Sequence, residues 1–152
     1  MHSVTTVARA VIVRDGRVLM IEVADGDDRW WILPGGRQEF GETLAETLAR
    51  ECREELNADV TVGDCVTVRE FIGSRRKRVI GDVAALHSVE FYFTATLASA
   101  IDLVPRDPGH RSIAWIPVGE LPNRKAFPKS LSEVVRRNGD QGTTPLYLGD
   151  AD

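Results

Sequence analysis

The spacing of apolar residues along the 152-residue chain changes twice, and each change predicts a different kind of element. Apolar and β-branched residues dominate the start of the chain, where the Asp15-Gly16 pair predicts a tight hairpin turn. Beyond residue 58 the apolar positions again recur every second residue, as is typical of strands. The predicted strands cover residues 4–13, 17–23, 30–33, 59–72, 87–97 and 113–118.

Between these groups of strands the apolar spacing is helical. Thr43-Leu44-Ala45-Glu46 is a capping box, in which Thr43 and Glu46 satisfy each other's backbone N–H groups. Asn57 stands where a helix often ends in a left-handed residue. The apolar positions of this helix are Leu44, Ala45, Leu48, Ala49, Cys52 and Leu56. A second, closing helix is predicted over residues 130–137, with Arg136 and Arg137 in its last turn.

Strands before and after a central helix, with a second helix at the end, predict a mixed α/β layered domain. The chain shows no internal repeat and no linker-like stretch. We therefore expect one domain over residues 1–138, followed by a turn-rich tail over residues 139–152.

Composition narrows the classes of protein. Apolar residues make up 43% and charged residues 28%, which excludes a disordered or low-complexity chain. Nineteen basic residues against 23 acidic residues give a net charge of −4, so we expect no nucleic-acid polymer as partner. Cys52 and Cys65 lack metal-ligand spacing and suit a reducing compartment. Without an export signal or an apolar run near the roughly 20 residues of a membrane span, we expect a cytoplasmic protein with no membrane association.

Three glutamates of the central helix carry the chemistry. At about 100° per residue, Glu51, Glu54 and Glu55 gather at one edge of the apolar stripe, away from the solvated face expected for Arg50. Like charges at this spacing repel, and the last turn of a helix favours cations. A divalent cation would remove both penalties, and few hard oxygen ligands suit Mg²⁺ or Mn²⁺. The alternative is a set of ordinary surface glutamates on a Glu-rich helix.

A longer motif surrounds these glutamates. Gly36, five residues, Glu42, seven residues and then Arg50-Glu51-Cys52-Arg53-Glu54-Glu55 resemble the Nudix box of Nudix hydrolases, and Leu33-Pro34-Gly35-Gly36 resembles its usual start. The resemblance covers residues 36–58 and departs at its end, where Asn57 replaces the usual Gly and Ala58 a larger aliphatic residue. It implies a Nudix-like α/β/α sandwich with a mixed sheet and a catalytic loop–helix–loop.

The resemblance also implies roles for single residues. The implied metal ligands are Glu51, Glu54, Glu55 and the carbonyl of Gly36. Glu54, Glu55 or a carboxylate from a later loop would activate water, while Arg50 holds the carboxylates and Glu42 fixes the loop. Glu46 is also spaced to pair with Arg50. Gly35 and Gly36 would let the backbone approach a substrate, a small-molecule nucleoside diphosphate derivative. The resemblance also leaves a homodimer open.

Arg9 and the basic stretch have two interpretations each. Arg9 interrupts a strand, so it either reaches water from a sheet edge or faces a phosphate. The Arg75–Arg78 stretch is interpreted as a solvated hairpin tip, with a polyphosphate or partner contact as the alternative. Trp30 and Trp31 alternate along a strand, so one packs inward and the other is a candidate for base stacking.

The strand at 87–97 also carries candidate polar groups. We interpret His87 as structural, with catalysis as the alternative. Glu90 lies on the opposite face of the strand and is a weaker candidate for an extra carboxylate near the metal.

Three functions compete. The leading hypothesis is a divalent-metal-dependent pyrophosphohydrolase that cleaves a nucleoside diphosphate linked to another group. A Nudix-like sensor that binds a nucleotide sugar without cleaving it need not keep three mutually repelling glutamates. An isoprenoid diphosphate isomerase would need a catalytic cysteine, which neither Cys52 nor Cys65 supplies. Gly73 and Ser74 stand where some relatives carry a Pro or Tyr marker for ADP-ribose or dinucleoside polyphosphates, and the motif associated with NADH hydrolysis is also absent.

Overall fold

The computed structural model describes residues 2–76, 81–98, 102–136 and 146–151, and its strands form two sheets. The first sheet contains, in order, β10 (Tyr147–Asp150), β6 (Val60–Ile72), β7 (His87–Leu97), β1 (Thr5–Val11) and β5 (Gly35–Arg37). The second contains β2 (Val13–Arg14), β3 (Arg17–Asp25), β4 (Asp28–Ile32) and β9 (Ala126–Phe127), with β8 (His110–Pro117) also paired to β3. The first sheet is mixed, because β7 runs parallel to β1 and antiparallel to β6.

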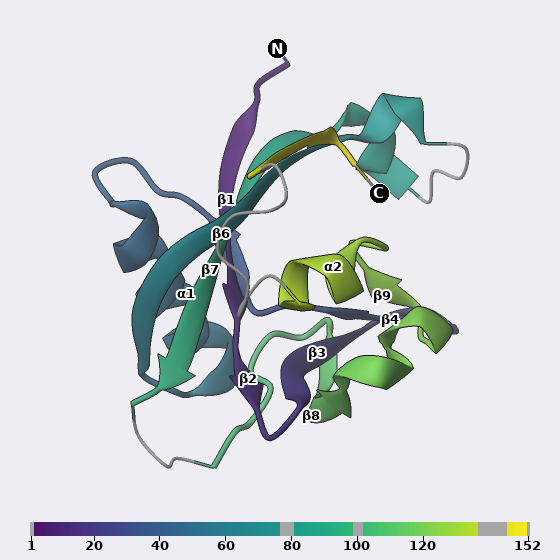
Figure 1. The fold of residues 1–152 in the computed structure, drawn as a ribbon. Coiled ribbons are helices and arrows are strands. Elements are labelled where there is room, and N and C mark those ends of the chain that lie inside the picture. The colour runs from purple at the N-terminus through teal and green to yellow at the C-terminus, as the bar shows by residue number, and fades with distance from the viewer. Residues whose placement is uncertain (1, 77–80, 99–101, 137–145, 152) are drawn as a thin grey trace.

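Two α-helices flank the sheets. α1 (Leu44–Leu56) lies on one side of strands β1, β6 and β7, and α2 (Leu131–Arg136) lies on the other (Figure 1). Short 3-10 helices η1 (Gly73–Arg75), η2 (Gly81–Ala85) and η3 (Val118–Asn123) complete the described helices. The mixed α/β fold is confirmed, whereas the division of the strands into two sheets is not part of the sequence prediction.

The ends of α1 are those that the sequence predicts. The Thr43 hydroxyl accepts the Glu46 N–H at 3.2 Å, and the Glu46 carboxylate accepts the Thr43 N–H at 2.7 Å. Asn57 ends the helix in the left-handed conformation, with φ 56° and ψ 41°. Asn in place of Gly therefore preserves the turn that follows the helix.

Two hydrophobic clusters hold these layers together. In one, Leu48, Cys52 and Leu56 of α1 pack against the alanines of β1 and against Leu19 and Ile21 of β3. In the other, residues of both sheets enclose Val134 of α2. The small alanines of β1 let α1 lie close to the sheet, which brings the glutamate-bearing face of the helix near β5.

Three short strands escape the sequence analysis. Gly35–Arg37, expected to end a strand, instead forms β5 and pairs with β1. Ala126–Phe127 forms β9 beside β4. In the predicted turn-rich tail, residues 139–145 lie outside the described part of the chain, but residues 147–150 form β10 and pair in parallel with β6. Each strand has two to four residues, too few for a period to show.

Crossing a lipid bilayer requires a long apolar helix. No helix within residues 2–76, 81–98, 102–136 and 146–151 has that length and apolar character.

Candidate functional site

Two glycines bring β5 unusually close to its neighbours. Gly35 lies opposite Arg9 with φ +141°, and a Cβ atom there would lie 2.0 Å from the carbonyl oxygen of Ala8. A Cβ atom on Gly36 would lie 2.4 Å from the carboxyl carbon of Glu51. Real Cβ contacts are longer than this, so only glycine fits at position 35, where backbone blocks the space, whereas a side chain at position 36 would have to displace the carboxylate end of Glu51. The helix glutamates can consequently reach the backbone of β5.

Glu55 is the most deeply placed of these glutamates. Glu55 is only 8% exposed, and its Oε2 accepts the N–H of Gly35 at 3.1 Å. Burial raises the pKa of Glu55 to about 7, because water no longer solvates the charged form. The Gly35 hydrogen bond and the charge of Arg9 oppose this rise, whereas the charges of Glu51 and Asp107 add to it. The carboxylates of Glu51, Glu55 and Asp107 thus concentrate negative charge at a place that is partly shielded from water.

The other two glutamates differ in exposure. The Glu51 side chain is 15% exposed and accepts a hydrogen bond from Arg50 at 2.8 Å, whereas that of Glu54 is 59% exposed and lies 3.4 Å from Arg50. The expected convergence in a partly dry place therefore holds for Glu51 and Glu55 and is wrong for Glu54. Among the described residues, no three His, Cys, Asp or Glu side chains are gathered closely enough to hold a metal ion as they stand.

The donor chemistry nevertheless suits a hard divalent cation. Glu51 and Glu55 are one helical turn apart, face β5 and repel each other, as the effect of Glu51 on the pKa of Glu55 shows. Arg50 offsets the charge of Glu51, whereas Glu55 accepts its hydrogen bond from the Gly35 N–H. Carboxylate oxygens are the ligands that Mg²⁺ and Mn²⁺ prefer.

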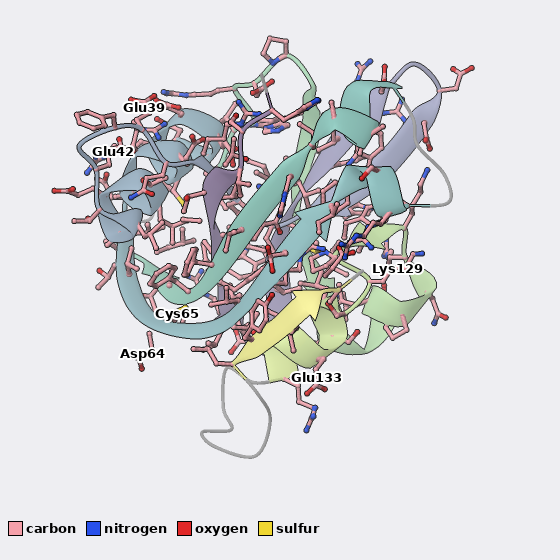
Figure 2. The ribbon with its side chains drawn as sticks, turned by 90° about the horizontal axis from the view of Figure 1, so that it is seen from above. Glu39, Glu42, Asp64, Cys65, Lys129 and Glu133 are labelled. Atoms are coloured by element: carbon pink, nitrogen blue, oxygen red, sulfur yellow. The ribbon has the colours of Figure 1, made fainter. Side chains whose placement is uncertain are left out.

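Arg50 links the loop to the helix. Its Nε donates to Glu42 at 2.6 Å, and its Nη2 donates to Glu42 at 3.1 Å and to the Arg37 carbonyl at 3.0 Å. Figure 2 shows Glu39 and Glu42 on the loop that leads into α1. The hydrogen bond from Arg50 lowers the pKa of Glu42 to about 2. The expectation of a freely solvated Arg50 is wrong, since this loop folds over its guanidinium.

The contacts of Glu42 reach beyond Arg50. Its carboxylate also accepts the Thr47 hydroxyl at 2.9 Å and the Glu39 N–H at 3.1 Å. Glu46, which is spaced to pair with Arg50, is instead engaged in the helix cap. The loop, the first turn of α1 and Arg50 therefore form one hydrogen-bonded unit.

Arg9 lies inside the first sheet. β1 is flanked by β7 and β5, so the interpretation of Arg9 as an edge residue is wrong. Its Nη1 donates to the carbonyls of Leu33 at 3.3 Å and Gly35 at 3.2 Å. Its positive charge opposes the rise in the pKa of Glu55, and it adds to the stronger effect of Arg69, which holds the pKa of Glu90 below its usual value. A guanidinium is thus held beside the carboxylate site.

The sequence analysis did not single out Asp107 and His110. Asp107 lies in the loop before β8, and its charge contributes to the raised pKa of Glu55. Burial lowers the pKa of His110, against the opposing charges of Asp107 and Glu51. The Nδ1 atom of His110 is buried without a hydrogen-bond partner among the described residues. The turn signal Asp107-Pro108-Gly109 just ahead of a strand could have drawn attention to this loop.

A sequence model of the NUDIX domain matches residues 4–137. The chain belongs to the NUDIX family. Over 84 residues it is 34% identical to a CTP pyrophosphohydrolase of Escherichia coli, covering 54% of this chain and 58% of that protein. Over 119 residues it is 29% identical to a nucleoside triphosphatase, NudI, of Escherichia coli, covering 76% of this chain and 84% of the relative.

Solved structures agree on the fold. A NUDIX hydrolase from Nitrosomonas europaea superposes with a TM-score of 0.76 at 18% identity, covering 95% of this chain and 94% of that one. The match to the first curated relative, by contrast, spans little more than half of that protein's length.

Other candidates of the sequence analysis contact different residues of this NUDIX domain. The His87 ring contacts Glu70 at 3.2 Å, which agrees with a structural role. Glu90 is buried in an ion pair with Arg69 at 2.9 Å. Trp31 packs against the core, and Lys125 lies 5.9 Å above the ring of Trp30. Of the basic stretch, residues 77 and 78 lie outside the described residues.

The two thiols of the NUDIX domain are unpaired and unsuited to catalysis. Cys52 is fully buried between α1 and the sheet, and burial raises its pKa to about 12. The Cys65 thiol donates to the Thr67 carbonyl, and partial burial raises its pKa as well. Nucleophilic cysteines have lowered rather than raised pKa values. This disfavours the isomerase hypothesis.

Proposed function

We propose that this NUDIX domain is a divalent-metal-dependent pyrophosphohydrolase that cleaves a nucleoside diphosphate linked to another group. The observation that carries the proposal is the pair of carboxylates packed against β5, Glu51 and Glu55. Glu55 is buried and has a raised pKa, while the charge of Glu51 opposes its ionisation. A fold without a cation at this point would be more stable with a neutral residue in place of Glu55.

Glu51, Glu54, Glu55 and the Gly36 carbonyl are the proposed ligands of Mg²⁺ or Mn²⁺. Such an ion, when bound, neutralises charge that develops on the oxygens of a diphosphate. To bind the ion, the Glu54 side chain must turn away from Arg50. It can do so because the Glu54 side chain is mostly exposed. Arg50 and Glu42 act by fixing the loop against α1.

Hydrolysis of the substrate needs one water molecule and one base. The water oxygen forms a bond to phosphorus, the bridging P–O bond breaks, and the leaving phosphate takes the electron pair. Glu54, Glu55 and Asp107 are the candidates for the carboxylate that accepts the proton of the water. Arg9 is positioned to bind a phosphate oxygen if its guanidinium exchanges one of its two carbonyl contacts.

The relatives narrow the first substrates to test. The names of two of them specify CTP and nucleoside triphosphates, in which a nucleoside diphosphate is linked to a further phosphate. We therefore propose nucleotides or nucleotide sugars as substrates. A cytoplasmic location is part of the proposal, since Cys52 and Cys65 are unpaired.

The test is a substrate panel of nucleoside triphosphates and nucleotide sugars with Mg²⁺ or Mn²⁺, in which phosphate is measured after a coupling phosphatase. Turnover should require the metal and fall at least about 100-fold in Glu51→Gln and Glu55→Gln. Glu120→Gln is the matched control, because it removes one carboxylate from η3, where Glu120 accepts a hydrogen bond from Arg124 at 2.7 Å. Tight nucleotide binding that survives EDTA, without turnover on any substrate, would overturn the proposal in favour of a sensor.

A further inference from the structure

A short segment near the end of the chain forms one edge of the first sheet. We call residues 146–151 the strap; they contain β10, which lies beside β6 close to η1 and η2 (Figure 1). The Leu146 carbonyl accepts the Val68 N–H at 2.8 Å and the Thr67 hydroxyl at 3.1 Å. Leu146 and Tyr147 are more than half exposed, and no strap residue belongs to the buried core of the described chain. Polar contacts rather than apolar burial therefore hold the strap.

The strongest of these contacts surround the carboxylate of Asp150. Its Oδ1 accepts hydrogen bonds from Arg76 Nη2 at 2.6 Å and from the Ile72 N–H at 3.2 Å. Its Oδ2 lies 3.7 Å from Arg75 Nη1. Two guanidinium groups and a backbone amide thus converge on one oxyanion.

Residues outside the strap also help to fix the position of Arg76. Its guanidinium lies 5.0 Å from the centre of the Phe71 ring, and its side chain is only 16% exposed. Its Nε atom is buried without a hydrogen-bond partner among the described residues. A buried donor without a partner is costly, and a larger oxyanion with more acceptor oxygens could satisfy it.

Charge favours phosphate over carboxylate as the external ligand. Asp150 supplies one negative charge to two guanidinium groups, and the Arg75 side chain is 66% exposed. A phosphate group carries nearly two charges at neutral pH and presents three oxygens to arginine. The acidic neighbour, Glu70, is engaged by His87 and by the Tyr147 hydroxyl. These bonds hold its carboxylate but do not remove its repulsion of an anion.

We propose that Arg75, Arg76 and the Ile72 amide form a second anion site, for phosphate-bearing small molecules, which Asp150 occupies as a built-in competitor. Binding of a phosphate displaces the strap from this edge of β6. Displacement also removes the Ala151 carbonyl from Arg69, which it contacts at 2.7 Å. Because Arg69 bonds to Glu90 and Tyr92 inside the sheet, the strap is connected to the interior of the domain.

The test measures tripolyphosphate binding to the full chain in EDTA by calorimetry, so that its result does not depend on hydrolysis. If the strap occupies the site in about nine of ten molecules, removing the competitor raises the apparent affinity about tenfold. Asp150→Asn should show this gain. Asp64→Asn, an equal charge change at an exposed position far along β6, should bind like the parent (Figure 2). Adding Arg76→Gln to Asp150→Asn should abolish the gain.

A second measurement follows the strap in the parent protein. Saturating tripolyphosphate should shift the amide NMR signals of Gly149 and Ala151 towards their positions in Asp150→Asn. Equal affinities of parent and Asp150→Asn would overturn the proposal. A gain that persists after Arg76→Gln, or tripolyphosphate bound at Arg76 with unmoved strap signals, would overturn it as well.

Discussion

Replacing Glu55 by Gln should stabilise the metal-free protein while it removes activity. Gln keeps an oxygen that can accept the Gly35 N–H, but it removes a buried charge beside Glu51 and Asp107. The folded-state pKa of Glu55 is raised from 4.5 to about 7, so the folded protein holds this proton more tightly than the unfolded chain. The contribution of Glu55 to stability is therefore full below pH 4.5 and is lost as the pH rises towards 7.

The size of the expected change in unfolding free energy follows from the shift in the pKa of Glu55. A rise from 4.5 to about 7 corresponds to about 3 kcal/mol at high pH, of which about 2.5 kcal/mol is lost between pH 5 and pH 8. Over that range the difference in unfolding free energy, Glu55→Gln minus parent, should rise by about this amount. Taking the difference cancels every other group that titrates equally in both proteins.

Urea unfolding in EDTA at pH 5, 6, 7 and 8 measures this difference directly. Glu54→Gln is the matched control, since it removes the same charge from a mostly exposed side chain one position away on α1. Adding Mg²⁺ at pH 8 should stabilise the parent and leave Glu55→Gln almost unchanged. A difference that does not vary with pH, or the same variation in Glu54→Gln, would refute the reasoning that Glu55 carries a buried charge.

Four further variants test the loop and the helix. Gly36→Ala should lower kcat/KM about 10- to 100-fold and cost under about 1 kcal/mol of stability, because only the end of the Glu51 side chain must move. Gly35→Ala should cost at least about 2 kcal/mol in urea unfolding, because its Cβ atom would meet backbone. Equal stability costs for the two variants would contradict this contrast. Arg50→Lys should lower kcat/KM at least about tenfold, since lysine cannot contact Glu42 and the Arg37 carbonyl together, and unchanged kinetics would exclude such a positioning role. Glu42→Gln should melt below the parent at pH 7, and the gap should close as the pH falls from 4.5 towards 2, because the pKa of Glu42 is lowered in the fold; a gap that stays constant during acidification argues against the Arg50 contact as its cause.

Local signals account for the elements that the sequence predicts well. The α1 helix has a complete capping box, an apolar stripe and a left-handed Asn57, and these interactions lie within a few residues of one another. The Asp15-Gly16 turn is also local, with φ values of 51° and 71°. Such features survive in almost any tertiary context, so a single sequence is enough to predict them.

The strands β5 and β10 depend on partners far away in the sequence. β5 exists because Gly35 fits against the carbonyl of Ala8, and β10 exists because Val68 and Arg76 offer donors to residues 146–151. Neither strand has an alternating pattern of its own, since its own residues are too few. Pairing across more than 25 residues is decided by tertiary packing, which composition and periodicity do not describe.

The candidate site shows the same division between local and distant causes. Helical spacing places Glu51, Glu54 and Glu55 on one side of α1, but their exposure depends on how closely β5 approaches that side. The approach depends in turn on the missing Cβ atoms of Gly35 and Gly36. Glu55 is buried where it reaches the backbone of Gly35, whereas the side chain of Glu54 is 59% exposed. The helix pattern could therefore indicate a cation site, while the difference between the two neighbouring glutamates could come only from the fold.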